Sequence, residues 1–337
     1  MQEQNMSGGA ENFNQEKKFN GKMFLLGLLG FLALALAAAL AVGIYRVYAK
    51  AATDGFTLTV ARVLRLPAFK ADDKAVLYVD YADDLRAIRA MRDFDKKNNG
   101  ENAELTDQQM SDQVLWRLLN NVLLDKAAKT YNLKVQESDL RDLKRQVMQN
   151  FKNEDEANKE IKERYGWDFA TYQKKVMSQY VLQSKLDQEV QGDKKLLDEQ
   201  FVLANKVLTE VKGGADFAEL AKKYGQDGTA AAGGDLGWFA KGEMVPAFET
   251  AAFALKKGEL AKDPVETEFG FHVLKVTDKK TEKKKDAKGK TTSVAQVRAS
   301  HILFRRPNAS QYLDKLARQA NLHLYIAVHD PFAGLKK

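Results

Sequence analysis

The sequence of 337 residues contains no cysteine. The chain therefore forms neither a disulfide nor a lipid-modified cysteine, and this absence neither requires nor forbids an exported domain. Proline is also scarce, because only Pro67 precedes Pro246. Since proline interrupts a helix interior, its absence between these positions is in keeping with mostly helical structure there.

Charge is missing from one stretch near the N-terminus. Residues 23–45, MFLLGLLGFLALALAAALAVGIY, carry no charged side chain. At 1.5 Å per residue they form a helix of roughly 34 Å, long enough to cross the hydrocarbon core of a membrane. A secretory signal has a shorter apolar run, of roughly 7–15 residues. We therefore predict a polar tail over residues 1–22 and an uncleaved transmembrane helix over residues 23–45, with a cleaved signal as the alternative.

The cations that flank this run do not decide its orientation. Three lysines precede it and four cations follow it closely: Lys17, Lys18 and Lys22, then Arg46, Lys50, Arg62 and Arg65. The positive-inside rule therefore leaves the direction of the helix open.

Lysine dominates a second stretch, residues 278–292, DKKTEKKKDAKGKTT, and contributes to the net charge of +7. Because Ala287 is its one apolar residue, we expect a solvated loop over residues 277–296. Attraction to anionic lipid headgroups is an alternative for a tethered chain. The lysines are not interleaved with aromatic residues, so we expect no binding to nucleic acid.

Between these stretches the apolar spacing predicts helices over about residues 72–191. Thr106, followed three residues later by Gln109, predicts a capping box before a broad apolar stripe. A further helix is expected over residues 137–151. From residue 194 we expect two amphipathic helices divided by Gly213–Gly214, a glycine-rich turn region, a short helix over 248–255, and a hairpin over 264–276.

Two segments of this second half carry a family pattern. GGDLGWFAKGEMVPAFETAAFALKKGEL, residues 233–260, and PVETEFGFHVLKV, residues 264–276, closely resemble the parvulin class of peptidyl-prolyl isomerases. The preceding region, with LTDQQ, YNLKVQESDL and YGWDFATYQKKV, is similar to the chaperone module of exported parvulin foldases of the PrsA/SurA type. The resemblance implies an α+β protein: a helical chaperone module over 50–193, a parvulin domain with a four-stranded antiparallel sheet over 194–306, and a C-terminal helix, brief strand and tail over 307–337.

The sequence departs from the family pattern in one respect. Parvulins open with a strand of the form Ala-Ser-His-Ile-Leu, but QGDKKLLDEQF stands before Val202, and the matching segment VRASHILF occupies residues 297–304. In the family the first and last strands are antiparallel neighbours at the centre of the sheet. We therefore expect a circularly permuted domain that is closed by residues 297–304. The alternatives are a strand donated to a neighbouring chain, and a truncated second parvulin repeat that begins at Val297.

The resemblance also assigns an apolar pocket. Leu236, Met244 and Phe248 match the family's seat for the proline ring, and Phe239 is a further candidate beside it. Without the resemblance, residues of these types at this spacing are more often plain core.

Four polar residues match the family's centre of activity. His272 and His301 match its paired histidines, which on adjacent strands are able to share one proton. Asp227 stands where the family carries Cys or Asp beside the reacting amide, and Thr267 matches a hydroxyl next to the histidines. The alternatives are a structural role for each histidine and a turn-capping role for Asp227.

The implied function is that of a peptidyl-prolyl cis-trans isomerase and chaperone, anchored as a single-pass protein in the cell membrane with its C-terminal domains extracytoplasmic. The reaction uses no cofactor and no metal, because an enzyme lowers the barrier of about 18–20 kcal/mol by binding the twisted amide more tightly than the planar forms. The expected partners are unfolded, newly exported, proline-containing polypeptides, and the lipid bilayer through residues 23–45. A non-catalytic holdase that binds such chains through the helical module is the alternative. The sequence does not indicate an oligomeric state.

Overall fold

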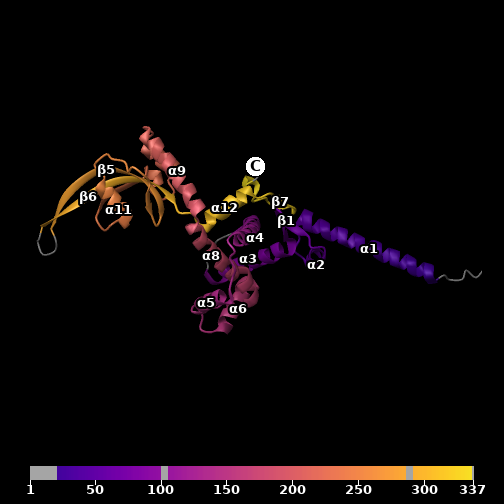
Figure 1. The fold of residues 1–337 in the computed structure, drawn as a ribbon. Helices are drawn as coiled ribbons and strands as arrows, with labels where there is room; N and C mark the ends of the chain where they lie inside the picture. The colour runs from indigo at the N-terminus through magenta and orange to yellow at the C-terminus, as the bar shows by residue number, and fades with distance from the viewer. Residues whose placement is uncertain (1–20, 100–104, 286–290, 336–337) are drawn as a thin grey trace, which may run out of the picture.

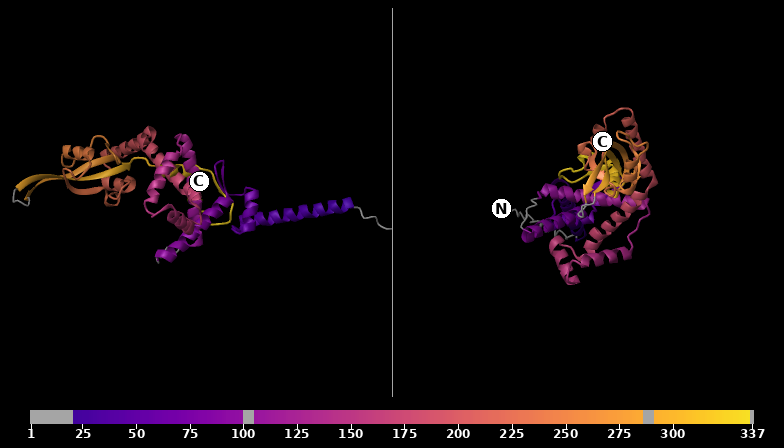
Figure 2. Two further views of the ribbon diagram at one scale, coloured as in Figure 1. Left: turned by 90° about the horizontal axis from the view of Figure 1, so that it is seen from below. Right: turned by 90° about the vertical axis from the view of Figure 1, so that its left-hand side faces the viewer.

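The computed structural model describes residues 21–99, 105–285 and 291–335. Helix α1 (Gly21–Lys50) projects from one end of an elongated molecule, a mostly helical module lies in the middle, and a mixed domain with a long β-ribbon forms the other end (Figure 1). The left-hand view of Figure 2 shows the same order of parts from below. Within the described residues, α1 is the one helix long and apolar enough to cross a membrane, with a mean hydropathy of 2.4 over an 18-residue stretch of Leu28–Lys50.

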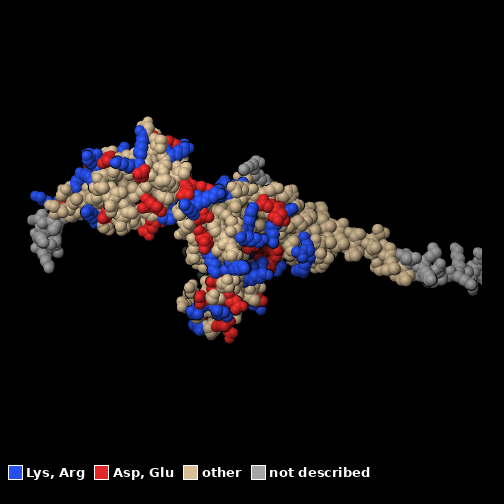
Figure 3. All heavy atoms as spheres, in the orientation of Figure 1, with Lys and Arg blue, Asp and Glu red and all other residues tan. Residues whose placement is uncertain are grey.

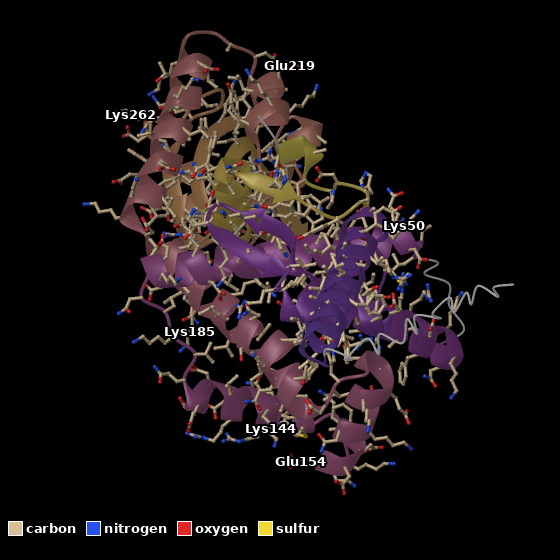
Figure 4. All side chains as sticks on the ribbon, turned by 90° about the vertical axis from the view of Figure 1, so that its right-hand side faces the viewer. Lys50, Lys144, Glu154, Lys185, Glu219 and Lys262 are labelled. Carbon is tan, nitrogen blue, oxygen red and sulfur yellow. The ribbon has the colours of Figure 1, made fainter. Side chains whose placement is uncertain are left out.

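The helical module is built mainly from amphipathic helices that follow the predicted periodicity. The apolar stripe of α4 is buried in the core, and the predicted capping box is confirmed: the Gln109 amide donates to Thr106 Oγ1 at 3.2 Å, and the Thr106 amide donates to Gln109 Oε1 at 2.9 Å. Lys144 and Glu154 join two helices of this module by an ion pair of 2.6 Å (Figure 4). The helices are α2 (Gly55–Val63), α3 (Tyr78–Asn99), α4 (Asp107–Thr130), α5 (Glu137–Met148), α6 (Glu154–Tyr165), α7 (Phe169–Tyr172), a π-helical turn (Gln173–Met177) and α8 (Ser178–Gly192).

The module also contains a small sheet that the periodicity did not predict. Strands β1 (Pro67–Ala71) and β2 (Lys74–Leu77) form a hairpin, so the expected start of helical structure near residue 72 is wrong. Strand β7 (Leu322–Leu324) pairs with the other side of β1, in the order β2-β1-β7. Asp72, in the turn at φ 51°, fixes this pairing because its carboxylate and its amide both bond to the backbone of Asn321, each at 2.9 Å.

The C-terminal segment completes the core of the helical module. Helix α12 (Ala309–Gln319) and then β7 confirm the predicted helix and brief strand. Leu313 and Ala317 of α12 are buried in the same core as α4 and α8, and so is Phe332 near the end of the chain. The chain therefore leaves the helical module through α9 (Lys194–Lys212) and returns to it after the mixed domain.

The mixed domain has a four-stranded antiparallel sheet in the order β3-β6-β5-β4. Alternate residues of the central strands face opposite layers. Phe271, Val273, Ile302 and Phe304 pack under α9 and α10, whereas Leu274, Val276, Val297 and Ala299 pack against α11. The elements are α10 (Phe217–Tyr224), β3 (Asp235–Ala240), α11 (Pro246–Ala254), β4 (Val265–Thr267), β5 (Gly270–Lys285) and β6 (Thr291–Arg305).

The predicted lysine-rich loop over 277–296 is wrong, because β5 and β6 continue through it as a paired ribbon. The register runs to Lys285 opposite Thr291, and residues 286–290 lie outside the described part of the chain. A two-stranded ribbon exposes both faces to water, so lysine side chains do not oppose it, and the facing strand contributes the β-branched residues Thr291, Thr292 and Val294. The expected closing strand, 297–304, is the inner part of β6. The ribbon lies at the opposite end of the molecule from α1, which argues against contact between these lysines and the membrane that α1 would span (Figures 1 and 2).

Candidate active site

The two central strands bring His272 and His301 together on one face of the sheet. In the register, His272 of β5 is opposite Leu303 and His301 of β6 is opposite Leu274, so the histidines are diagonal neighbours. Their Nδ1 atoms are 2.9 Å apart, and their rings stack with centroids 5.1 Å apart. Both side chains are buried, with exposures of 4% and 6%. A hydrogen bond between the two Nδ1 atoms requires that one carries the shared proton and the other accepts it.

Two predicted polar residues extend this pair at its two ends. Thr267 Oγ1 lies 2.8 Å from His272 Nε2, and Asp227 Oδ2 lies 2.9 Å from His301 Nε2. Thr229, which the sequence reasoning missed, lies 3.1 Å from His301 Nε2 and donates to Asp227 Oδ1 at 2.8 Å. The sequence offered one indication of this role, because Thr229 stands two residues after Asp227. In a turn, a hydroxyl at this spacing readily forms a hydrogen bond to the aspartate.

One assignment of protons gives each hydrogen bond in the series Thr267–His272–His301–Asp227 a donor and an acceptor. An ionised Asp227 only accepts, so His301 donates to it through Nε2–H and accepts at Nδ1. His272 then donates through Nδ1–H and accepts at Nε2 from the hydroxyl of Thr267. Every ring nitrogen of the pair is thereby engaged within the protein.

Burial keeps both imidazoles uncharged. It lowers the pKa of His272 to about 4, and the neighbouring His301 acts in the same direction. Burial also lowers the pKa of His301, although the carboxylate of Asp227 opposes the shift. For Asp227, burial acts to raise the pKa, but hydrogen bonds from Thr229 and His301 outweigh it and hold the pKa below its usual value. Near neutral pH the site therefore contains two neutral rings and one carboxylate.

An apolar wall stands beside the histidines. The ring of Phe248, on α11, lies edge-on to both imidazoles, with centroids 5.1 Å from His272 and 5.7 Å from His301. Leu236 and Met244 are half-buried and pack against the same cluster. Phe239 is 1% exposed and its ring centroid lies 6.3 Å from that of Phe248. Phe239 therefore supports Phe248 from the core, whereas the half-buried Leu236 and Met244 are open to a ligand.

The glycine-rich turn before β3 holds β6 at the position of His301. Gly234, with φ 77°, accepts from the amide of His301 at 2.9 Å. A Cβ atom at Gly234 would lie 2.0 Å from the carbonyl oxygen of His301, so glycine is needed for this close approach. The adjacent Asp235 forms an ion pair of 2.6 Å with Arg298, also on β6.

A hollow lies in the helical module. It is a cavity of about 230 Å³ whose walls include Ile88, Met91, Val114, Trp167 and Val176. Asp84 lies at its edge, buried and paired with Arg117 and with Lys175, the latter at 2.7 Å. The sequence reasoning did not single out these residues, because an apolar stripe does not distinguish a cavity wall from filled core.

Comparison with known proteins identifies the mixed domain. Residues 168–280 match the family described as "PPIC-type PPIASE domain". The chain is 53% identical over 81 residues to a foldase protein PrsA of Geobacillus sp., a match that covers 24% of this chain and 29% of that protein. It is 38% identical over 136 residues to a foldase protein PrsA of Oceanobacillus iheyensis (40% and 44% of the two chains), and 40% identical over 111 residues to a chaperone SurA of Bordetella avium (32% and 21%).

These findings confirm the predicted resemblance and the α+β class: the chain contains a parvulin-type domain related to PrsA foldases and SurA chaperones. The chain spans less than half the length of each of these curated relatives. The match to a crystal structure of a peptidylprolyl isomerase (PrsA) from Bacillus anthracis covers 60% of this chain and 84% of that chain, at 18% identity and a TM-score of 0.21.

Proposed function

We propose that this protein is a membrane-anchored peptidyl-prolyl cis-trans isomerase and chaperone that acts on unfolded, exported, proline-containing polypeptides. One observation carries the proposal: in a domain that matches the PPIC-type family, His272 and His301 share a hydrogen bond beside the ring of Phe248. The apolar helix α1 supports the anchor, and the named relatives support an extracytoplasmic place for the domains that follow it.

The site works by shape and fixed polarity. Leu236, Met244 and Phe248 seat the proline ring, while the rest of the substrate turns about the bond that precedes it. The barrier of about 18–20 kcal/mol arises from the partial double-bond character of that bond, and binding the twisted amide preferentially lowers it. Because every ring nitrogen of the histidine pair is engaged, the pair does not exchange a proton with the substrate. It is a positioning element that fixes the strands and the electrostatics beneath the proline.

We also propose that the isomerase domain extends over residues 194–306 and is circularly permuted, with residues 297–304 in the place of the family's first strand. The central position of β6, antiparallel to β5, supports this arrangement. Only residues 286–290 connect the two strands, and so short a connection favours pairing within one chain over donation to a neighbour.

A protease-coupled assay on a proline-containing tetrapeptide tests the isomerase. The full chain in detergent should accelerate isomerisation, and the Met244→Ala, Phe248→Ala double variant should lose at least about tenfold in kcat/KM, since it removes most of the proline seat. A control with Val202→Ala and Phe269→Ala, at two exposed apolar positions of the same domain, should keep full activity. If wild-type activity is no higher than that of the double variant, the proposed isomerase activity is refuted.

The cavity in the helical module supports the second candidate, a holdase that binds unfolded chains there. Its volume of about 230 Å³ and its apolar walls suit one large apolar side chain. In this case the full chain suppresses aggregation of an unfolded protein, and Ile88→Asp in the cavity wall weakens the suppression. The Met244→Ala, Phe248→Ala variant retains suppression while it loses isomerisation, so the two functions separate.

A further inference from the structure

Helices α1 and α2 form an antiparallel pair where the apolar helix meets the helical module. Arg46 of α1 donates from Nε to Oγ1 of Thr57 at 3.0 Å. One turn earlier in α1, a Cβ atom on Gly43 would lie 2.5 Å from Val60, one turn later in α2. Residue numbers therefore rise along α2 as they fall along α1, and the end of α2 points toward the N-terminal half of α1.

The same pairing sets the end of α2 beside the apolar part of α1. Val63 and Leu64 follow Val60 by three and four positions, which places them level with Leu40 and Ala39. Leu40 and Ala39 are the first half-buried positions among the described side chains of α1, which agrees with cover from α2. The end of α2 thus lies alongside residues that belong to the uncharged run 23–45.

The thickness of a bilayer then fixes the depth of this corner. A membrane-spanning helix needs about 20 residues for a hydrocarbon core of about 30 Å. Counted from Met23, where the uncharged run begins, that length ends near Val42. Ala39 and Leu40 come before this limit, so residues level with them lie at or just inside the boundary of the hydrocarbon core.

The side chains at the corner have the chemistry of that boundary. Val63 is 70% exposed and Leu64 is 38% exposed, although both are apolar. Arg62 and Arg65 flank them and are also exposed. In Figure 3 the surface of α1 is almost free of charge, and Lys and Arg gather where it meets the helical module. Apolar tips flanked by arginines suit the boundary between acyl chains and anionic headgroups.

We propose that the corner of residues 62–65 is a second membrane contact, in which Val63 and Leu64 enter the upper acyl region while Arg62 and Arg65 bind anionic headgroups of the bilayer that α1 spans. This inference rests on the proposed anchoring through α1. It gives the helical module one fixed pose, because Val47 of α1 is fully buried in the module core and the carbonyl of Tyr48 accepts from the amide of Ala327 at 2.8 Å. Anchor, corner and module therefore meet the membrane as one body.

Depth-dependent quenching of single-cysteine variants tests the proposal, and the absence of native cysteine makes them simple to prepare. The full chain carries a fluorophore at Val63→Cys, Leu64→Cys, Leu34→Cys in mid-helix, or Val202→Cys on α9. Each is reconstituted in vesicles of phosphatidylcholine and phosphatidylglycerol, with bromines placed near the ester or deep in the acyl chain, or with iodide in the water. All four positions are exposed in the structure, so labelling leaves the fold intact.

We expect the probes at positions 63 and 64 to be quenched most by shallow bromines, and their iodide quenching to be several-fold weaker than at position 202. Arg62→Glu with Arg65→Glu should reverse much of that difference in anionic vesicles. If position 34 is quenched by deep bromines while positions 63 and 64 match position 202, the corner contact is refuted and the anchor stands. If position 34 is not quenched by lipid, both the anchor and the corner contact are refuted.

Discussion

The Nδ1 atoms of His272 and His301 lie 2.9 Å apart although 29 residues separate them along the chain. Neighbouring strands of one sheet bring them together, and a single direction of hydrogen-bond donation runs from Thr267 through both rings to Asp227. Because the rings are buried and uncharged, the arrangement links the stability of the sheet to pH.

Acid should destabilise the isomerase domain before it destabilises the helical module. The pKa of His272 is about 4 in the folded chain, against about 6.5 in the unfolded chain, so between these values the unfolded state binds more protons. The free energy of unfolding is unaffected by this group above about pH 6.5. As the pH falls toward 4, the free energy of unfolding decreases by up to about 1.4 kcal/mol per pH unit and by about 3 kcal/mol in total. Hydrogen exchange of the β5 and β6 amides, measured across this range, gives the slope. His272→Asn should flatten it, whereas His323→Asn, at an exposed position of β7, should not.

Gly234 and Gly237 offer a matched pair of substitutions. Both have positive φ, at 77° and 69°, but an added Cβ would meet the His301 carbonyl only at Gly234 and would meet nothing within 4 Å at Gly237. Gly237→Ala should cost about 1 kcal/mol for the backbone conformation alone. Gly234→Ala must also push β6 away, so we expect a loss of at least about 3 kcal/mol in the free energy of unfolding, together with a fall in isomerase activity. If the two variants lose equal free energy of unfolding in urea titrations, the close contact described between Gly234 and the His301 backbone is contradicted.

Asp227 should act through the histidines rather than on the substrate. In Asp227→Ala, His301 loses the carboxylate acceptor at Nε2 and the charge that opposes the downward shift of its pKa, while the hydroxyl of Thr229 remains 3.1 Å from Nε2 as a weaker acceptor. We expect kcat/KM to fall about tenfold, mainly through kcat, and the nitrogen chemical shifts of His301 to report a mixture of tautomers. Asp227→Asn, which keeps an acceptor without the charge, should be intermediate, and Asp263→Ala at an exposed loop position serves as the control. Unchanged histidine shifts in Asp227→Ala would refute the proposed proton order.

A disulfide between β5 and β6 separates pairing within one chain from exchange between chains. Lys275 and Ser300 are directly opposite in the register, at a separation that suits a disulfide. Oxidised Lys275→Cys, Ser300→Cys protein should run as a monomer on a non-reducing gel, while Lys275→Cys alone forms no internal bridge. A cross-linked dimer as the main product of the double variant would favour a donated strand.

Local patterns predicted local structure well. The capping box at Thr106, the stripe of α4 and the hairpin around Gly270 all depend on residues close together in sequence. The same reasoning missed one local element, the hairpin of β1 and β2. It could not place β7 beside β1, because β7 arrives some 250 residues later in the chain. Composition also failed for the lysine-rich ribbon, where backbone pairing that begins inside the domain continues into water.

The residues of the candidate site could be predicted from the family resemblance, and composition alone indicated them less clearly. We predicted that His301 lies beside His272 because residues 297–304 match a family strand that normally comes earlier in the sequence. The register of β5 and β6 brings the two histidines together within one chain. Thr229 was missed because its role depends on a turn that folds it back toward His301. The roles of all these residues in catalysis remain predictions for the variants above.

The late position of β6 has a consequence for the order in which the molecule matures. A ribosome delivers β3, β4 and β5 first, yet β3 has no partner in the sheet until residues 291–305 emerge. The helical module likewise waits for α12 and β7 to close its core. Both halves therefore finish folding only after residues 291–324 have been synthesised, so a chain cut short anywhere before residue 305 contains neither a complete isomerase domain nor a complete helical module.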